Sequence, residues 1–266
     1  MSAVDRLFEQ LRARGQKALM PFVTAGDPDL AFTAAVVREL AGRGCHLCEL
    51  GVPYSDPIAD GPVIQDSYTR ALQHHIKLAD IFDTVGSLAA DVQAPLLTMV
   101  SYAIVYRHGL AKYVGELQAA GGAGMIVPDL PIEESAELAK LCRDAELSLV
   151  QLITPTTPRE RARKIAESST GFIYYVSVVG ITGERDELPP EIAENVAWLR
   201  EQTPLPICIG FGISRPEHVQ VLGPVADGLI VGSAIVKRIA TAAEKSREAA
   251  VRGIGDYVSE LLDALD

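Results

Sequence analysis

Short apolar segments alternate with helix-length amphipathic segments along all 266 residues of the chain. Alternation of this kind predicts a parallel sheet covered by helices, and continuous apolar segments suit strands that are buried on both faces. Strands are expected at residues 18–24, 46–51, 95–101, 124–128, 148–153, 172–178, 206–210 and 228–231. Helices are expected at about 28–42, 62–74, 78–90, 109–120, 132–145, 158–168, 190–202 and 216–222, with one or two more over 233–264.

The number of repeats favours an α/β fold in which the sheet closes on itself, a (β/α)8 TIM barrel. Residues 1–266 are expected to form it as a single domain, since the length suits such a barrel and no linker interrupts the chain. A doubly wound open sheet is the alternative, but no GxGxxG motif follows the first expected strand. Val4, Leu7, Phe8 and Leu11 recur at helical spacing. This spacing predicts an extra N-terminal helix that packs against the bottom of the barrel.

The chain is acidic, with a formal net charge of -11 and a pI near 5.0. This charge argues against a surface for nucleic acid or anionic membrane, because no basic stripe is available to neutralise phosphates. No stretch approaches the ~18 apolar residues of a membrane span. The first 14 residues are charged and amphipathic and do not resemble a signal peptide. We therefore expect a cytoplasmic protein.

Cysteines and histidines do not indicate a metal site. A CxxC pattern begins at Cys45, but a second pair of ligands is missing and a strand would turn the two sulfur atoms to opposite faces. The histidines form no HExxH or other ligand spacing. All four cysteines lie in apolar segments and are expected to be core thiols: Cys45, Cys48, Cys142 and Cys208.

A carboxylate-rich loop, stiffened by glycine and proline, follows the second expected strand. Glu49 lies on the strand face opposite Cys48 and Leu50, away from the aliphatic packing side. Asp60 lies just before a helix that is expected to begin at Pro62. Both acids could face one cavity and act as a catalytic pair. The structural alternative is a salt-bridged strand end for Glu49 and a helix cap for Asp60.

Three glycine sites follow the late strands, where barrels often bind phosphate. Glycine lets backbone N–H groups approach an anion, and a helix N-terminus adds its partial positive charge. The three sites contain Gly183, Gly212 and Gly232 with Ser233. They would lie across the barrel mouth from the two acids, so the sequence predicts an elongated phosphorylated substrate.

Apolar and aromatic residues at strand ends are expected to form the middle of this pocket, which would suit a flat aromatic ligand. Core packing is the alternative for each of them. Residues 178–189 form a long irregular connection after the sixth strand and are expected to act as a lid. The wall residues are Phe22, Ile153, Tyr174 and Phe211.

Two longer motifs carry a family resemblance. Residues 21–28 (PFVTAGDP) and 49–62 (ELGVPYSDPIADGP) closely resemble the tryptophan synthase alpha subunit family. The match spans essentially the whole chain. Supporting motifs are VPDLP at 127–131, GITG at 180–183, GFGIS at 210–214 and VGSAIV at 231–236.

The resemblance implies a lyase of tryptophan biosynthesis that needs no cofactor of its own. It implies retro-aldol cleavage of indole-3-glycerol phosphate to indole and D-glyceraldehyde 3-phosphate. It also implies a partner, the beta subunit, which holds pyridoxal phosphate, receives the indole and forms an alpha2beta2 heterotetramer.

The resemblance also implies roles for individual residues. Glu49 matches the general acid/base that protonates the indole ring carbon and helps to deprotonate the glycerol hydroxyl. Asp60 matches the acceptor for the indole N–H, and Thr182 is expected to order the lid against it. Phosphate-binding positions match Gly183, Gly212, Gly232 and Ser233, and pocket or loop positions match Phe22, Asp129, Ile153, Tyr174, Thr182 and Phe211.

Two departures from the family pattern are present. The segment before Gly180 lacks an arginine that some members carry, and Ile104 stands where many members have asparagine. The first affects the charge contacts expected of the lid, and the second the expected partner surface. Two other functions stay open: a free-standing lyase that releases indole, and a docking subunit that is mainly allosteric.

Overall fold

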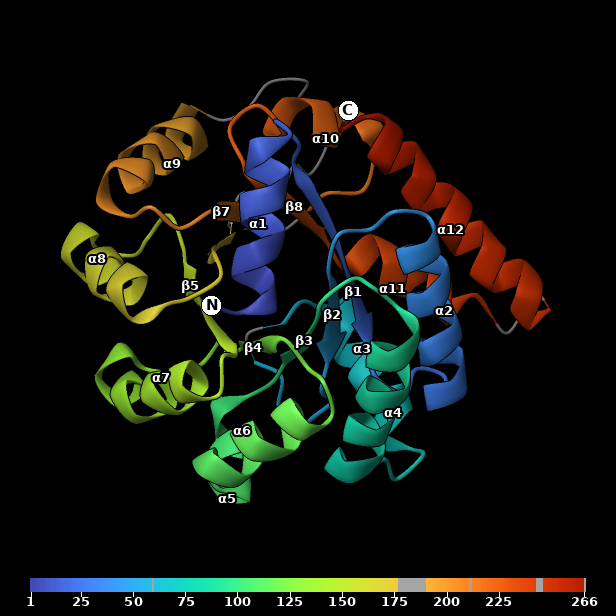
Figure 1. Cartoon of the computed structure of the whole chain (residues 1–266). Coiled ribbons are helices and arrows are strands. Elements are labelled where there is room, and N and C mark those ends of the chain that lie inside the picture. The colour runs from blue at the N-terminus through green and yellow to red at the C-terminus, as the bar shows by residue number, and fades with distance from the viewer. Residues whose placement is uncertain (59, 177–189, 211, 243–245, 266) are drawn as a thin grey trace.

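The expected alternation of strands and helices is present in the computed structural model, which describes residues 1–58, 60–176, 190–210, 212–242 and 246–265 (Figure 1). The strands are β1 Ala18–Thr24, β2 Cys48–Gly51, β3 Leu96–Met99, β4 Gly124–Ile126, β5 Ser148–Ile153, β6 Ile173–Val176, β7 Ile207–Gly210 and β8 Gly228–Val231. The helices are α1 Ala3–Ala13, α2 Leu30–Gly42, α3 Pro62–Leu72, α4 Leu78–Asp91, α5 Tyr102–His108, α6 Leu110–Ala119, η1 Ile132–Glu134, α7 Ser135–Asp144, α8 Arg159–Ser168, α9 Pro190–Gln202, α10 Pro216–Leu222, α11 Ser233–Ala240 and α12 Arg247–Asp263. Among the described residues, no helix has the length and apolar character needed to cross a bilayer.

The strands form a closed parallel barrel in the order β1 to β8, and β8 pairs with β1. The expected (β/α)8 TIM barrel is confirmed, and the open doubly wound sheet is excluded. At one seam Ala18 of β1 lies beside Gly228 of β8, and at the next seam Phe22 lies beside Glu49 of β2. All strands run the same way, so their carboxyl ends, and the loops that follow them, gather at one mouth of the barrel.

Alternating strand residues divide the core into an inner and an outer part. Leu47, Leu97 and Ile126 pack with one another inside the barrel. Cys48 and Leu50 of β2 belong to a different cluster, which packs the strands against helices such as α2. Because side chains alternate along a strand, Glu49 shares the inner face of β2 with Leu47. The predicted orientation of Glu49 is therefore confirmed.

The extra N-terminal helix closes the amino end of the barrel, as the sequence predicted. Val4, Phe8 and Leu11 of α1 are buried in the cluster that fills the barrel interior. The ring of Phe8 lies 5.7 Å from that of Phe172, and Figure 1 shows α1 lying across this end of the barrel. The opposite end is left for the loops that carry the predicted site.

One helix, α5, was not predicted from the sequence. It has only seven residues, which is too short to give a clear amphipathic pattern. The Ser101 side chain caps its first turn by accepting a hydrogen bond from the Ala103 amide, and Gly109 separates it from α6. Several strands are also shorter than expected, and β2 begins at Cys48 rather than at residue 46. The predicted strands are too long because the apolar pattern follows burial, and buried residues continue beyond the ends of the strands.

Candidate active site

Glu49 is fully buried at the centre of β2 and points into the barrel. Its backbone lies beside Phe22 of β1 and Leu97 of β3. Neither oxygen of its carboxyl group has a hydrogen-bond partner among the described residues. The salt-bridged strand end that was the structural alternative is therefore absent from this part of the chain. A buried polar group without a partner is costly and is common at functional sites.

Burial raises the pKa of the Glu49 carboxyl well above its ordinary value. Removal of the charged form from water is the cause, since a carboxylate in an apolar interior loses its hydration. Complete burial thus favours the protonated form of the Glu49 carboxyl. Glu49 can therefore act first as an acid and, once it has given up its proton, as a base.

Asp60 lies in the loop that joins β2 to α3 and is half-buried. It is not a helix cap, because the N-cap of α3 is Gly61, without any side-chain hydrogen bond. The pKa of Asp60 is raised to about 6 in total, because burial and the charge of Asp129 raise it more than a hydrogen bond from the Tyr54 hydroxyl lowers it. Asp60 is therefore mostly ionised near neutral pH, in contrast to Glu49. The two carboxyl groups have the different environments that separate acid and base roles.

The end of β1 and the loop after it bind to α3, the helix that follows Asp60. Asp27 is 1% exposed and pairs through both oxygens with Arg70 of α3, at 2.7 and 2.9 Å. The hydroxyl groups of Thr24 and Ser67 lie 2.6 Å apart on the same two elements. These contacts fix α3 on the carboxyl end of β1, and so they fix the end of the loop that carries Asp60.

Two aromatic side chains lie near the acids: Tyr174 lies near both, and Phe22 lies beside Glu49. Tyr174 of β6 is half-buried, and its pKa is raised well above the ordinary value by burial and then by the charges of Glu49 and Asp60. It lies over Gly210, where any Cβ atom would come within 2.5 Å of its hydroxyl. Phe22 packs with Tyr68 of α3 in a small buried cluster at this end of the barrel. Both residues lie toward the carboxyl end of the barrel, and their role as walls of a pocket stays a prediction.

Asp129 follows β4 and connects the site to α5. One of its oxygens accepts a hydrogen bond from the Ser101 hydroxyl at 2.6 Å, and the other accepts one from the Tyr102 amide at 2.7 Å. A carboxylate at the first turn of a helix satisfies its free N–H groups. Its charge also raises the pKa of Asp60. Asp129 thus lies between the loop that carries Asp60 and α5, a relation that the sequence did not show.

The described glycine sites follow β7 and β8, as predicted. Gly212 is exposed and has a φ of 78°, a conformation that favours glycine. Gly232 is the N-cap of α11, and Ser233 is its first residue. The first amides of a helix have no partner within the helix and can bind an anion. Both sites lie at the same end of the barrel as Glu49.

Other predicted residues are placed differently or not described. Thr182, Gly183 and Phe211 lie outside the described residues, as do the 178–189 segment and the position of the missing arginine. Ile153 packs in the outer cluster with helices, whereas Leu152 packs with Tyr174 inside the barrel. The packing of Ile153 does not support its prediction as a pocket wall, because neighbouring strand residues face opposite sides.

Sequence reasoning missed the residues that support Asp60 and the helix that follows it. Tyr54 bonds to Asp60, and the Asp27–Arg70 pair fastens α3. Tyr54 lies in the same motif as both acids, which is a usable signal. Arg70 follows Asp27 by 43 positions, and no local sequence pattern predicts their pairing, because only the fold brings them together.

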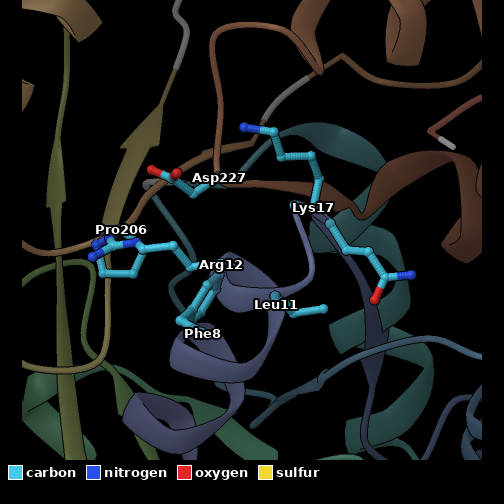
Figure 2. Close-up of a pocket in the computed structure, with 8 residues that line it drawn as sticks. Phe8, Leu11, Arg12, Lys17, Pro206 and Asp227 are labelled. Atoms are coloured by element: carbon cyan, nitrogen blue, oxygen red, sulfur yellow. The ribbon is translucent and has the colours of Figure 1, made fainter.

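The described residues contain no candidate metal site, and a cavity lies away from the two acids. No group of three or more potential metal ligands occurs in the described part of the chain, and the four cysteines are buried and free. A cavity of about 130 Å³ lies at the amino end of the barrel, beside α1 (Figure 2). Its Asp227 is already bonded to Arg200 and to the Ile207 amide. It contains neither predicted acid, so we do not assign the site there.

Comparisons with known proteins agree with the barrel fold and with the family resemblance. A family described as "Tryptophan synthase alpha chain" matches residues 8–264. The tryptophan synthase alpha chain of Rhodopirellula baltica is 53% identical and covers 100% of this chain and 99% of its own, and that of Rippkaea orientalis is 45% identical over 100% and 98%. The crystal structure of tryptophan synthase subunit alpha from Legionella pneumophila has a TM-score of 0.91 at 33% identity, covering 100% of this chain and 99% of that one. The chain belongs to the tryptophan synthase alpha chain family.

Proposed function

We propose that Glu49 and Asp60 carry the chemistry of the lyase reaction in this chain. As a family member the chain is a lyase that cleaves indole-3-glycerol phosphate in the tryptophan synthase reaction, and it needs no cofactor of its own. The observation that carries the assignment is the Glu49 carboxyl group, which is fully buried and has no hydrogen-bond partner among the described residues. Such a group is left free for a ligand.

Glu49 acts as the acid and then as the base. Because its pKa is raised, the Glu49 carboxyl can hold a proton and give it to the indole ring carbon that carries the glycerol chain. The carboxylate that results then takes the proton of the adjacent glycerol hydroxyl. The oxygen electrons form the aldehyde C=O bond, the carbon–carbon bond breaks, and its electrons restore the aromatic ring. The products are indole and D-glyceraldehyde 3-phosphate, and Glu49 is protonated again.

Asp60 stabilises the charge that appears on the indole ring between these steps. Protonation of the ring carbon leaves positive charge on the ring N–H, and a fixed carboxylate that accepts this N–H lowers its energy. The Tyr54 hydroxyl supports the role, because its hydrogen bond opposes the rise in the pKa of Asp60 that burial causes. Asp60 thus keeps its charge over most of the neutral range.

The phosphate group of the substrate would bind between the loop after β7 and the start of α11. Gly212, Gly232 and Ser233 provide exposed backbone and a helix N-terminus there. Thr182 and Gly183 belong to the same proposal on the strength of the family motif. Phe22 and Tyr174 would contact the indole ring between the phosphate and the acids.

We propose a docking face for the beta subunit next to the catalytic loop. Ile58 and Tyr106 are among the large apolar residues that the structure leaves exposed, at 94% and 68%. Ile58 lies two residues before Asp60, and Tyr106 lies on α5, which Asp129 caps. Ile104 is half-buried against the core and is therefore less available to a partner. A face of this kind would let docking act on Asp60.

Assembly and location follow from the same proposal. A solved relative, the tryptophan synthase complex of Pyrococcus furiosus, is 35% identical with a TM-score of 0.83. Its similarity supports partnership with a beta subunit, and we propose an alpha2beta2 heterotetramer. We further propose that residues 1–266 form a single domain and that the protein works in the cytoplasm.

Indole release by the purified chain from indole-3-glycerol phosphate, with and without a beta subunit, tests the function. We expect slow release alone and a large increase on addition of the beta subunit. An equal rate without the partner would favour a free-standing lyase, and no release under either condition would favour a docking subunit.

The Glu49→Gln variant tests the proposed role of the acid. It keeps the shape of the side chain and removes the proton that titrates, so we expect turnover to fall by at least about 10²-fold with little change in ligand affinity. Near-normal turnover would contradict the assignment. The Glu9→Gln variant is the matched control, because Glu9 lies exposed on α1.

A further inference from the structure

The segment after β7 is held from two sides by side chains of α10 and α12. His218 of α10 is 3% exposed, and its Nδ1 atom accepts a hydrogen bond from the Ser214 amide at 3.2 Å. Tyr257 of α12 donates its hydroxyl proton to the Ser214 carbonyl at 3.1 Å. Both peptide groups of Ser214 are therefore engaged by buried or half-buried side chains. Two residues before Ser214 lies Gly212, in its positive-φ conformation.

The state of both side chains suits this arrangement. Nδ1 of His218 accepts from the Ser214 amide in the tautomer that leaves Nδ1 unprotonated, and Nε2 lies 3.3 Å from Nη2 of Arg215. Burial and then the charge of Arg215 lower the pKa of His218 by more than a hydrogen bond to the Gly212 backbone and the charge of Glu217 raise it, so the neutral ring is favoured. Burial raises the pKa of Tyr257 to about 12, so its hydroxyl keeps the proton that it donates.

Tyr257 also connects this segment to the second glycine site. The guanidinium group of Arg238 lies 3.4 Å from the centre of the Tyr257 ring. Arg238 belongs to α11, the helix that begins at Ser233. Tyr257 therefore contacts both the segment after β7 and α11, the helix whose first turn forms the other half of the proposed phosphate site.

We propose that His218 and Tyr257 are positioning residues that set the affinity of the site for the phosphate end of its ligand, by holding residues 212–214 in place beside α11. This inference rests on the proposed function. Neither residue touches the substrate. They act because a backbone amide binds phosphate well only when it points at the oxygen, and a segment with one glycine at positive φ has other conformations available.

Three variants test the proposal. His218→Leu removes the acceptor at similar volume, whereas His218→Asn keeps an acceptor near the position of Nδ1. Tyr257→Phe removes only the hydroxyl. Tyr113→Phe is the control, because it removes another buried hydroxyl, bonded to Thr98 at 3.0 Å in a different cluster.

Binding is measured by calorimetry with 3-(indol-3-yl)propyl phosphate and with the matching alcohol, 3-(indol-3-yl)propanol. We expect His218→Leu and Tyr257→Phe to bind the phosphate about tenfold more weakly, the value of one misaligned hydrogen bond to a charged group. Affinity for the alcohol should stay the same in both variants. KM for indole-3-glycerol phosphate should rise with kcat nearly unchanged. His218→Asn and Tyr113→Phe should bind both ligands like the unaltered chain.

Equal losses for both ligands, or unchanged phosphate affinity in Tyr257→Phe, would overturn the proposal. If His218→Leu does not fold, the result for Tyr257→Phe alone decides the test. If the unaltered chain itself binds the phosphate no better than the alcohol, the proposed phosphate site fails and this inference fails with it. If the unaltered chain discriminates and the variants do so equally well, only the positioning role fails.

Discussion

Two carboxyl groups from one short stretch of sequence end in opposite protonation states because they differ in burial and in partners. Glu49 has no exposed surface and no hydrogen-bond partner among the described residues. Asp60 is half-buried, and the Tyr54 hydroxyl bonds to it. The pKa of Glu49 therefore lies well above its ordinary value, while that of Asp60 is raised to about 6. Their chemical roles follow from this difference.

The first prediction concerns the stability cost of Glu49. Its pKa is raised in the folded state, so the unfolded chain loses this proton at lower pH than the folded one does. Stability due to this group is thus present at low pH and is lost as pH rises above about 4.3. We expect Glu49→Gln to match the unaltered chain near pH 4 and to be more stable at pH 8, by more than about 1 kcal/mol.

Urea denaturation across this pH range measures the difference. Glu9→Gln on the exposed face of α1 is the control and should show no such growth with pH. A Glu49→Gln variant that is less stable than the unaltered chain at pH 8 would contradict the account of Glu49 as an unpaired buried acid.

The second prediction concerns the pH dependence of turnover. Asp60 must be ionised to accept the indole N–H, so kcat should fall as pH drops through about 6. The Tyr54 hydroxyl lowers the pKa of Asp60, so Tyr54→Phe should move this limb to higher pH. The substrate phosphate also titrates near pH 6, at about the same value in both proteins.

The pH profile of kcat at saturating substrate distinguishes the two sources. A limb that moves in Tyr54→Phe belongs to Asp60, and a limb that stays in place belongs to the phosphate. In Asp60→Asn the movable limb should be absent and kcat reduced by about 10²-fold or more. An unchanged rate in Asp60→Asn would mean that Asp60 has no catalytic role.

At the level of elements, α3 is tied to the region around the end of β1, and it follows directly on the loop that carries Asp60. Its Arg70 side chain pairs with the buried Asp27 carboxylate, and its Ser67 hydroxyl meets Thr24. Thr24 ends β1 and Asp27 lies in the loop just after it, and β1 lies beside β2 through the pair Phe22 and Glu49. The start of α3 is therefore tied to the strand next to the acid. A small shift of a catalytic group of this kind can cost up to about 10²-fold in rate.

The third prediction tests this connection. Arg70→Gln leaves the Asp27 carboxylate buried without its cation. We expect a stability loss of about 1–3 kcal/mol, less than for a fully buried pair because Arg70 is partly exposed. We also expect kcat to fall about tenfold through displacement of Asp60. Denaturation and steady-state kinetics measure the two effects.

The double variant Asp27→Asn/Arg70→Gln is the control, since it removes both charges and should recover part of the stability. If Arg70→Gln lowers stability while kcat remains unchanged, the pair is only structural and does not place the loop.

At the scale of the whole molecule, the barrel separates stability from chemistry along its axis. α1 closes the amino end with Val4, Phe8 and Leu11, and the two acids lie toward the carboxyl end. The barrel interior between them is lined mainly by apolar side chains, and the Glu49 carboxyl is fully buried there. Changes at the closed end should therefore affect folding far more than catalysis.

The fourth prediction is that Phe8→Ala lowers the stability of the chain without lowering its kcat. Phe8 is 5% exposed and packs against Phe172. Its loss should cost about 3–5 kcal/mol, while kcat of the folded protein stays nearly unchanged. Phe22→Ala is the matched aromatic control at the other end and should lower both stability and kcat. A large fall in kcat for Phe8→Ala would show that the two ends are coupled.

Much of this architecture could be predicted from local patterns. β1, β5 and β8 have the bounds that the apolar segments indicated, and α9 and α10 also agree. The short helix α5 could not be predicted, because seven residues give too little periodicity and its capping carboxylate, Asp129, comes from another loop. Ile153 shows a further limit. Its place at a strand end suggested the pocket, but the alternation of the strand turns it toward the helices.

The sequence alone determined the repeated strand–helix order, the inward face of Glu49 and the family, because these depend on periodicity and on motifs that are contiguous in the chain. Tertiary structure alone decided which charges meet. It brought Arg70 to Asp27, Asp129 to the vicinity of Asp60, and His218 and Tyr257 to Ser214. It also decided the protonation of the acids, since a pKa depends on burial and on neighbours that only the closed barrel supplies.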